Sequence, residues 1–385
     1  MNENKKTVSF TVAVITLIIV AGIMSLGLAI LKLNTMVTFI LTFLAVCIIA
    51  VCVGTKLNDL EGMILTGFNK TAQVCMIFIA VGMVVGSWII SGIVPSIIYY
   101  GLKLFTPSSF LALGFVVSCV VSFFTGSSYA ALGTMGIAFM AIGYGMEINP
   151  ALVAGMAVSG AVFGDKMSPF SDTTTMAPAA AGTDVFTHIK AMLWTVIPAF
   201  LVALVLYFVL GLQYNTADPE AMQSLTATIV YTIFAIELGE IMYQLGVMSV
   251  MLDKIRDRLE KPANLIITTL LTCLATVMLT TSQYMAILLP GEVFQDSYKK
   301  AKVAPQILSR TLEDGGTLFA FLVPWSAAAI YSSGVLDISA VQYLPFAFLP
   351  LICPLTAIVC AITGIGVYDT EGKSLRGKTM KKVAE

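Results

Sequence analysis

The stretch GDKMSPFSDTTTMAP, at residues 164–178, gathers carboxylates and hydroxyls between two strongly apolar segments. Asp165 and Asp172 lie seven positions apart, so they would share one face of an unbroken helix and could also converge in an opened turn. Pro169 removes a backbone donor and Gly164 favours unwinding, so a helix here should open and expose carbonyl groups. The hydroxyl-bearing candidates around the two acids are Ser168, Ser171, Thr173 and Thr174.

Such a set of side chains favours a hard cation. Oxygen atoms without nearby sulfur or imidazole suit Na⁺ better than a transition metal. The sequence therefore predicts a Na⁺ site at Asp165 and Asp172. The alternative is a cytoplasmic loop in which both acids are solvated, although the segments on either side are apolar.

A second polar stretch, RTLEDGGTLFAFLVPWSAA at 310–328, places Glu313 and Asp314 just before a glycine pair, with a proline further on. We expect the helix to break at the glycine pair. Burying an ionised carboxylate in a membrane costs at least roughly 2.5–3.5 kcal/mol, so acids at membrane depth are candidates for function. We therefore include Glu313, Asp314 and Ser326 among the predicted ion- or substrate-binding residues. The alternative is that Arg310 pairs with one of the acids in a structural role.

Two short polar motifs, TGSSY at 125–129 and TTSQY at 280–284, interrupt apolar segments. Their small hydroxyl-bearing residues are of the kind that a cation or carboxylate site needs. The alternative is a plain turn between two helices. The candidates in these motifs are Thr125, Ser127, Ser128, Thr280, Thr281 and Ser282.

Three further titratable residues stand apart from these motifs. Glu237 and Glu240 lie three positions apart on one face of an apolar helix, where a proton relay and pairing with basic residues of another helix are equally plausible. His188 is the only histidine, and its place beside Lys190 at a predicted boundary indicates an interfacial role rather than a catalytic one. No P-loop, HExxH, GxSxG or CxxC pattern is present, so we expect neither an enzyme nor a bound cofactor.

The composition places these motifs in a membrane. Of the 385 residues, 58% are hydrophobic and 11% are charged, whereas soluble domains have about 25% charged residues. The apolar runs at 8–31 and 35–53 are long enough to span a bilayer, and the first is too long for a signal peptide. All seven cysteines lie in apolar stretches, which predicts buried thiols. The predicted fold class is therefore an all-α polytopic membrane protein, and no basic stripe indicates nucleic acid.

The chain contains an internal duplication. Matches recur between residues 155 positions apart and fall on Gly, Pro, Ser, Thr and Tyr, as in Tyr129 and Tyr284 or Pro169 and Pro324. Each unit has a first helix, two apolar segments that meet at a polar tip, a segment broken by proline and glycine, and a last helix. These features predict re-entrant hairpins and broken transmembrane helices. Five segments separate corresponding helices, and an odd number gives an inverted-topology repeat.

The domain boundaries follow from this duplication. The predicted parts are an N-terminal helix pair with its cytoplasmic connection at 1–70, repeat unit 1 at 71–212, a linker at 213–225, an inverted repeat unit 2 at 226–367 and a basic cytoplasmic tail at 368–385. Lys and Arg gather on the side of the N-terminus, so we expect both termini to be cytoplasmic and the two tips to enter from opposite faces. A helix pair equivalent to the first two helices is missing before unit 2. The predicted last helices of the units are 190–212 and 343–367, and the first are 73–97 and 228–252.

The motifs GDKMSPFSDTT, GTDVFTHIKAMLWTVIPA, LSRTLEDGGTL and LVPW resemble those of the NhaC-type sodium/proton antiporter family of bacteria, within the ion-transporter superfamily. The resemblance extends roughly over residues 60–370, and the same family includes sodium-coupled malate/lactate exchangers. It implies an inverted-repeat fold in which two re-entrant hairpins and unwound helices form a site at the membrane midplane. The residues that it assigns to that site are Asp165, Ser168, Ser171, Asp172, Thr173, Thr174, Glu313 and Asp314. The chain departs from the family pattern at Thr175, Ser326 and Glu237, and it is shorter than typical members.

Three hypotheses follow. The first is exchange of Na⁺ for H⁺ across the bacterial cytoplasmic membrane, in which Asp172 with Asp165 forms one carboxylate site that binds either cation. The second is a sodium-coupled organic-anion exchanger of the malate/lactate type, whose tips bind a substrate carboxylate. The third is a truncated family member that does not transport. The expected partners are Na⁺, H⁺, small carboxylates, the lipid bilayer and a second copy in a homodimer.

Overall fold

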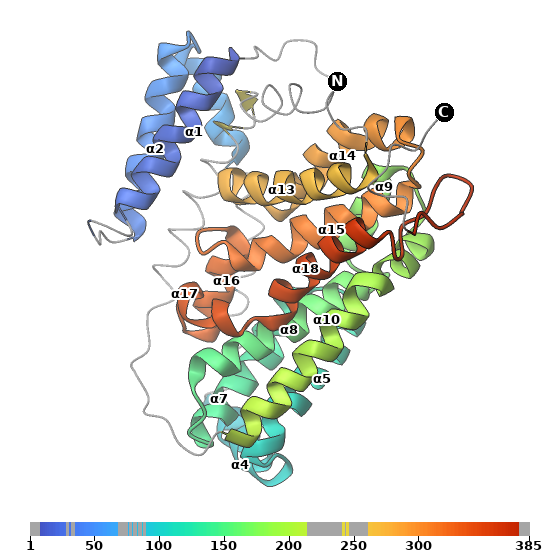
Figure 1. Cartoon of the computed structure of the whole chain (residues 1–385). Coiled ribbons are helices and arrows are strands. Elements are labelled where there is room, and N and C mark those ends of the chain that lie inside the picture. Colours follow the sequence, from blue (N-terminus) through green and yellow to red (C-terminus); the bar gives the residue numbers. More distant parts are fainter. Residues whose placement is uncertain are drawn as a thin grey trace.

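The protein is described by a computed structural model that covers residues 8–27, 31, 35–67, 76, 79, 83, 87, 90–213, 241–242, 244–245 and 261–376. Within these ranges the regular structure is helical, apart from two isolated β-bridges near the C-terminus (Figure 1). The predicted first helix of unit 2, at 228–252, lies almost entirely outside the described residues. The predicted first helix of unit 1, at 73–97, is described only in part, and it is not continuous there, because a turn with Gly92 at a φ of 74° precedes a helix that begins at Ile93. The chain is an all-α polytopic membrane protein.

Two sets of helices share one pattern of lengths. The first set is α5 (Pro107–Thr125), α6 (Ser128–Ala131), η2 (Leu132–Gly136), α7 (Ile137–Gly145), α8 (Pro150–Met167), α9 (Asp172–Ala181) and α10 (Val185–Gln213). The second set is α13 (Pro262–Thr280), α14 (Gln283–Lys300), α15 (Pro305–Leu322), α16 (Ala327–Leu336), α17 (Ala340–Tyr343), η3 (Leu344–Phe346) and α18 (Phe348–Thr363). The bounds of α5, α8 and α9 recur 155 residues later in α13, α15 and α16, and α14 spans the equivalent of α6 to α7.

Repeated start signals explain why the helix bounds recur. Pro107 and Pro262 open α5 and α13, and Pro150 and Pro305 open α8 and α15, at a position where the missing N–H has no helical partner in any case. Other helices begin after a serine whose hydroxyl accepts a hydrogen bond from a backbone N–H of the first turn. The serines that cap α6, α9, α14 and α16 in this way are Ser127, Ser171, Ser282 and Ser326.

The polar tips are tight turns between helices. Gly126 has a φ of 65° and ends α5, so the chain can reverse into α6. Thr281 has the equivalent place after α13 and a φ of 58°, a conformation that costs energy for a residue with a branched side chain. We call residues 125–129 tip 1 and residues 280–284 tip 2.

Both repeats contain a broken helix, but the breaks are not where the glycines suggested. The helix α8 continues through Gly164 as far as Met167, and α15 continues through Gly315 and Gly316 as far as Leu322. The expected break at the glycine pair is therefore wrong. A Cβ atom on Gly315 would lie 2.5 Å from Cβ of Cys273, so this glycine permits close packing of α15 against α13.

The interruptions lie at residues 168–171, which we call break 1, and 323–326, which we call break 2. Each contains a proline, Pro169 and Pro324, as the sequence predicted. At break 2 the axes of α15 and α16 differ by 47°. Prolines thus interrupt these helices, whereas the glycines lie inside them.

The last segments of the two units differ. The first is the single helix α10, whereas the predicted helix at 343–367 is divided into α17, η3 and α18 with a bend of 57°. Pro350 lacks the N–H that would bond to the carbonyl of Phe346 in a continuous helix. That carbonyl oxygen instead lies 2.6 Å from the hydroxyl of Tyr207, so a side chain of α10 supports the bend.

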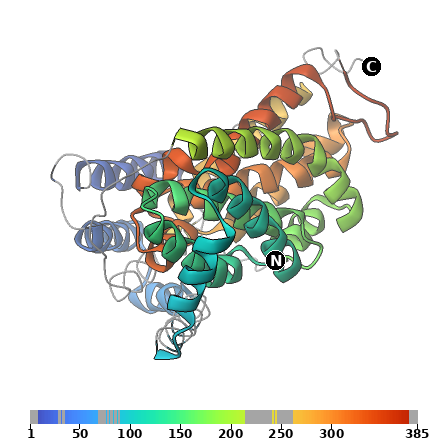
Figure 2. The ribbon, with the colours of Figure 1, turned by 90° about the horizontal axis from the view of Figure 1, so that it is seen from below.

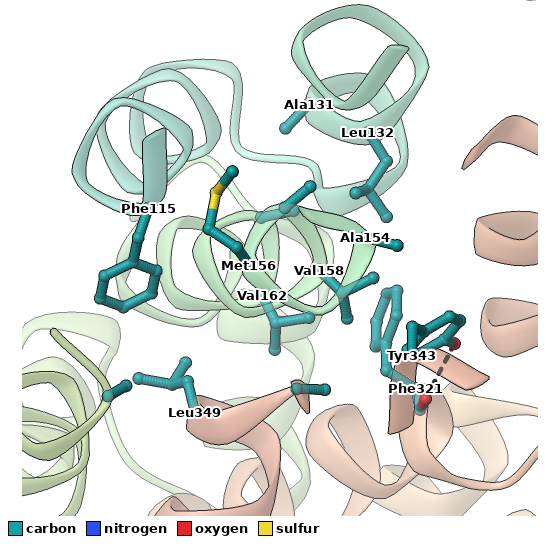
Figure 3. Packing of buried hydrophobic residues seen from close by; sticks show 14 of the residues in the cluster. Phe115, Ala131, Leu132, Ala154, Met156, Val158, Val162, Phe321, Tyr343 and Leu349 are labelled. Carbon is teal, nitrogen blue, oxygen red and sulfur yellow. Dashed lines mark hydrogen bonds between the residues drawn. The ribbon is translucent and has the colours of Figure 1, made fainter. Parts of the chain in front are cut away.

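The largest core surrounds α8, which is buried on nearly every side. Figure 3 shows Met156, Val158 and Val162 of α8 at its centre, between Phe115 of α5 and Leu349 of α18. The figure also shows the Tyr343 hydroxyl bonded to the carbonyl of Phe321, at 3.0 Å. A helix that is apolar on all faces requires neighbours on all faces, so α8 is fixed by both repeats.

The N-terminal helices α1 (Phe10–Ser25) and α2 (Thr35–Cys52) lie on one side of this body, in both Figure 1 and Figure 2, while α4 (Ile93–Leu104) packs against α7. Of the described helices, α5, α10 and α13 are long and apolar enough to cross a membrane. The number rises to five if two bent pairs, α15 with α16 and α17–η3 with α18, are each counted as one span. Near the C-terminus, the bridge between Val303 and Asp369 joins the chain after α18 to the α14–α15 connection.

Candidate ion-binding site

Asp165 lies where tip 1 meets break 1. It belongs to the last turn of α8, and its side chain is 2% exposed. Its Oδ2 accepts a hydrogen bond from Ser128 Oγ at 2.6 Å, and its Oδ1 accepts one from Ser171 Oγ at 2.7 Å. Three separate segments of the chain therefore converge on one buried carboxylate.

Hydroxyl groups of break 1 and α9 continue this network. Ser171 Oγ lies 3.0 Å from Thr173 Oγ1. The hydroxyl of Thr174 lies 2.9 Å from the carbonyl oxygen of Asp165 and 3.0 Å from that of Lys166, two groups that the end of α8 leaves without helical partners. Ser168 Oγ accepts a bond from the N–H of Phe170 within the break, at 3.2 Å. The predicted hydroxyls are thus assembled around the end of α8.

Asp172 has different surroundings from Asp165. It is exposed, it is the first residue of α9, and its Oδ1 accepts a bond from the N–H of Thr173 at 2.9 Å. Its Oδ2 accepts a bond from the hydroxyl of Tyr284 in tip 2, at 2.6 Å. The two aspartates interact electrostatically, but they bind different groups. Because α8 ends at Met167, they belong to two helices rather than to one helical face.

Each tip contacts the broken helix of the other repeat. Tyr284 of tip 2 reaches Asp172 of α9. Tyr331 of α16 donates to the carbonyl oxygen of Tyr129 in tip 1 at 2.7 Å, and the two rings lie 4.6 Å apart. Sequence reasoning did not include these tyrosines in the site. Their recurrence 155 positions apart, as Tyr129 and Tyr284, was the available signal.

The remaining candidates of the tips bind backbone groups. Thr125 Oγ1 lies 3.2 Å from the carbonyl of Ser122, and Thr280 Oγ1 donates to that of Thr276 at 2.7 Å. The backbone carbonyl of Thr281 accepts a bond from the N–H of Ala327, the first residue of α16. The contacts of both tips therefore connect the N-termini of α6, α9, α14 and α16, whose partial positive charges favour anionic groups nearby.

A fully buried ion pair joins the two repeats beside this site. Lys166 of α8 donates to Asp314 Oδ1 of α15, and neither side chain is exposed. Asp314 Oδ1 also accepts bonds from Thr195 at 3.0 Å and from Cys353 at 3.4 Å, while Arg310 Nε lies 3.9 Å from Oδ2. The alternative in which Arg310 pairs with an acid of its own segment is therefore confirmed. Lys166 was overlooked, although it is a cation within a buried motif.

Glu313 differs from its neighbour Asp314. It is also fully buried, but among the described residues neither of its side-chain oxygens has a hydrogen-bond partner. The side chains of Thr173 and Thr317 lie beside it, and the charges of Asp165 and Lys166 act on it. The carboxyl group of Glu313 is therefore close enough to Asp165 and Lys166 for their charges to act on it, but its oxygens accept no hydrogen bond from the described residues.

Other sequence-based candidates have mixed outcomes. His188 lies in the first turn of α10, where its side chain is fully buried and its Nδ1 lies 2.6 Å from Ser309 Oγ on α15, and its interfacial role stays a prediction. Glu237 and Glu240 lie outside the described residues. Ser326 is buried at the start of α16, where its hydroxyl caps the helix.

Curated relatives of this chain are membrane antiporters. It is 29% identical to the Na⁺/H⁺ antiporter NhaC of Alkalihalophilus pseudofirmus over 452 aligned positions, which include 95% of this chain and 97% of the relative. It is 27% identical to a malate-2H⁺/Na⁺-lactate antiporter of Bacillus subtilis, over 89% of this chain and 92% of the relative. An uncharacterised Na⁺/H⁺ antiporter of Haemophilus influenzae is 29% identical, over 77% and 84% respectively. No solved structure matches.

The first of these alignments is longer than the 385-residue chain, so the relative has stretches that this chain lacks. The sequence model of the Na⁺/H⁺ antiporter family matches residues 160–224 and 214–365, which together make up more than half of the chain. The two matched segments meet inside the predicted linker at 213–225. The match includes both breaks, tip 2 and the buried ion pair. By this match and these relatives, the chain belongs to the Na⁺/H⁺ antiporter family, as its resemblance to NhaC-type members indicated.

Proposed function

We propose that this protein is a secondary transporter that exchanges Na⁺ for H⁺, with Na⁺ bound at the carboxylate of Asp165. The observation that carries the proposal is the burial of this carboxylate between Ser128 of tip 1 and Ser171 of break 1. A buried acid at membrane depth is costly, so it is retained where an ion uses it. The relatives named as Na⁺/H⁺ antiporters support Na⁺/H⁺ exchange as the function.

The chemistry of the cluster fits a hard cation. The hydroxyls of Ser128 and Ser171 now donate to the carboxylate, but each also carries lone pairs that a rotation can turn toward a cation. A carboxylate and two hydroxyls supply only oxygen ligands, which Na⁺ prefers over sulfur or nitrogen. Because the ligands come from α8, tip 1 and break 1, a movement of tip 1 relative to α8 would open the cation to one side.

The charge distribution supports a cytoplasmic location for the end of the molecule at the α14–α15 connection. Lys299, Lys300 and Lys302 are exposed there, and the N–H of Thr370 bonds to the carbonyl of Lys302 at 3.2 Å, which brings the C-terminal segment to the same end. Exposed Lys373 lies on that segment. By the positive-inside rule, we propose that this end faces the cytoplasm of a bacterial cell.

An organic-anion exchanger is the second candidate because of the malate/lactate relative. A substrate carboxylate needs a cation or unpaired N–H groups. Among the described residues, the two fully buried cations, Lys166 and Arg310, both lie in ion pairs with Asp314, although Nε and Nη2 of Arg310 donate no hydrogen bond. Serine hydroxyls cap the four helix N-termini near the tips. The oxygen atoms around Asp165 favour Na⁺ as the transported species, and Arg310 is the buried cation that a substrate carboxylate would need.

The test is a ΔpH assay in inverted membrane vesicles, with Na⁺, Li⁺ and K⁺ added in turn. We expect Na⁺ to dissipate the pH gradient in the wild type but not in Asp165→Asn, and the matched control Asp296→Asn, an exposed acid at the end of α14, to behave as the wild type. Counterflow of labelled malate or lactate in proteoliposomes should be absent. Counterflow without any Na⁺-dependent pH change would replace this proposal with the organic-anion exchanger.

A further inference from the structure

The adjacent acids Glu313 and Asp314 are both fully buried, yet among the described residues only Asp314 accepts hydrogen bonds. Asp314 interacts with Lys166, Arg310, Thr195 and Cys353. Within the described part of the chain, neither oxygen of Glu313 accepts a hydrogen bond, and Thr317 Oγ1 one turn later also has no partner. An ionised carboxylate that accepts no hydrogen bond is unfavourable in such a place. Asp314 is therefore suited to remain ionised, whereas Glu313 is suited to alternate between the protonated and the ionised form.

The buried charges around Glu313 do not cancel when every acid is ionised. Asp165, Glu313 and Asp314 are negative, whereas Lys166 and Arg310 are positive, and none of the five is more than 2% exposed. The described part of the chain thus has one excess negative charge in this cluster. One added cation of either kind makes the cluster neutral.

The other titratable groups near the cluster do not change this balance. Each lies on a helix or tip packed against α8 or α15, and is neutral or solvated. The exposed Asp172 of α9 is solvated. His188 of α10 is fully buried, which disfavours its charged form. The thiols of Cys273 and Cys353 and the phenol groups of Tyr129, Tyr284 and Tyr298 are ordinarily uncharged at neutral pH.

We infer that the proton exchanged for Na⁺ is carried by Glu313, while Na⁺ binds at Asp165, so that the two ions compete through the charge of the cluster and not for one carboxylate. When Na⁺ binds at Asp165, the Glu313 carboxyl releases its proton to water on the side to which the site is open. When Na⁺ leaves on the other side, Glu313 takes up a proton there. One Na⁺ and one H⁺ therefore exchange, and the cluster stays neutral in both states. This inference rests on the proposed Na⁺/H⁺ exchange.

The decisive variant is Glu313→Gln, which keeps the shape of the side chain but cannot bind or release a proton. The experiment measures the apparent Na⁺ affinity from ²²Na⁺ exchange against internal Na⁺ in proteoliposomes at several pH values, together with the pH change that Na⁺ drives. In the wild type we expect the affinity to fall by up to about tenfold per pH unit on acidification, the limit for competition by one proton. In Glu313→Gln we expect an affinity that is weak and independent of pH, persistent ²²Na⁺ exchange at saturating Na⁺, and no proton movement.

The controls separate this inference from the proposed function. Glu292→Gln, at an exposed position of α14, should keep the pH dependence of the wild type. Glu313→Asp retains a titratable group and should recover proton coupling, which a merely structural role would not require. A pH-dependent Na⁺ affinity in Glu313→Gln would overturn the inference and return the proton to Asp165. Loss of ²²Na⁺ exchange in both Glu313 variants would also overturn it. A wild type that moves no protons with Na⁺ would instead refute the exchange itself.

Discussion

The ion pair between Lys166 and Asp314 should be the most sensitive part of the protein to single substitutions. In Asp314→Asn, Lys166 loses its hydrogen-bonded carboxylate partner while it remains fully buried. Breaking a buried pair by removing one partner costs about 3–5 kcal/mol, because the other charge is left uncompensated. A single hydrogen bond to a charged group contributes less, about 1.5–3 kcal/mol. Thr195→Val, which removes one such bond to Asp314, therefore provides the matched comparison.

The assay is equilibrium unfolding of the purified protein in detergent micelles, with the fraction folded followed as denaturant increases. We expect Asp314→Asn to lose about twice as much free energy of unfolding as Thr195→Val. The double variant Lys166→Met/Asp314→Leu should recover only part of that loss, because it removes the uncompensated lysine but leaves the buried Arg310 without its acid. An Asp314→Asn variant as stable as Thr195→Val, or a double variant less stable than either single one, would refute the reasoning.

Three further predictions concern transport and topology. Asp165→Asn should abolish Na⁺-dependent proton movement in vesicles, whereas Asp172→Asn should keep measurable exchange with a weaker Na⁺ affinity, because Asp172 is exposed and Asp165 is buried. Ser171→Ala should raise the Na⁺ concentration for half-maximal exchange by about tenfold, since a hydrogen bond to a charged group contributes about 1.5–3 kcal/mol and a water can replace part of it. Cysteines placed near Lys103 should react with an impermeant reagent from outside and those near Lys299 should not; labelling at Lys299 from outside would contradict the proposed orientation.

Local signals in the sequence were sufficient for much of the fold. The prolines of the two breaks and the serines that cap the following helices act on the backbone within a few residues, so they could be read without tertiary contacts. The glycine pair at 315–316 was misread because glycine both weakens a helix and permits another helix to approach. Only the presence of Cys273 on α13 decides between these two effects.

The candidate site was predicted less completely, because its contacts join distant parts of the chain. The hydroxyls of break 1 lie close to Asp165 in sequence and were identified. Lys166 and Tyr284 were not, since their partners Asp314 and Asp172 lie in the other repeat. A single sequence shows which residues are ionisable, but not which of them are buried side by side in the folded protein. The positions of the neighbouring side chains decide why Asp314 is paired and Glu313 is not.

The pairing of Lys166 with Asp314 also constrains how the protein is made. The two residues are 148 positions apart, and a ribosome adds about 5–20 residues per second, so the lysine emerges roughly 7–30 s before its partner. An unpaired lysine is costly at membrane depth during that interval. We therefore expect α8 to settle in its final place only after α15 has been made and Asp314 can pair with the lysine. Completion of the first repeat would then depend on the synthesis of the second.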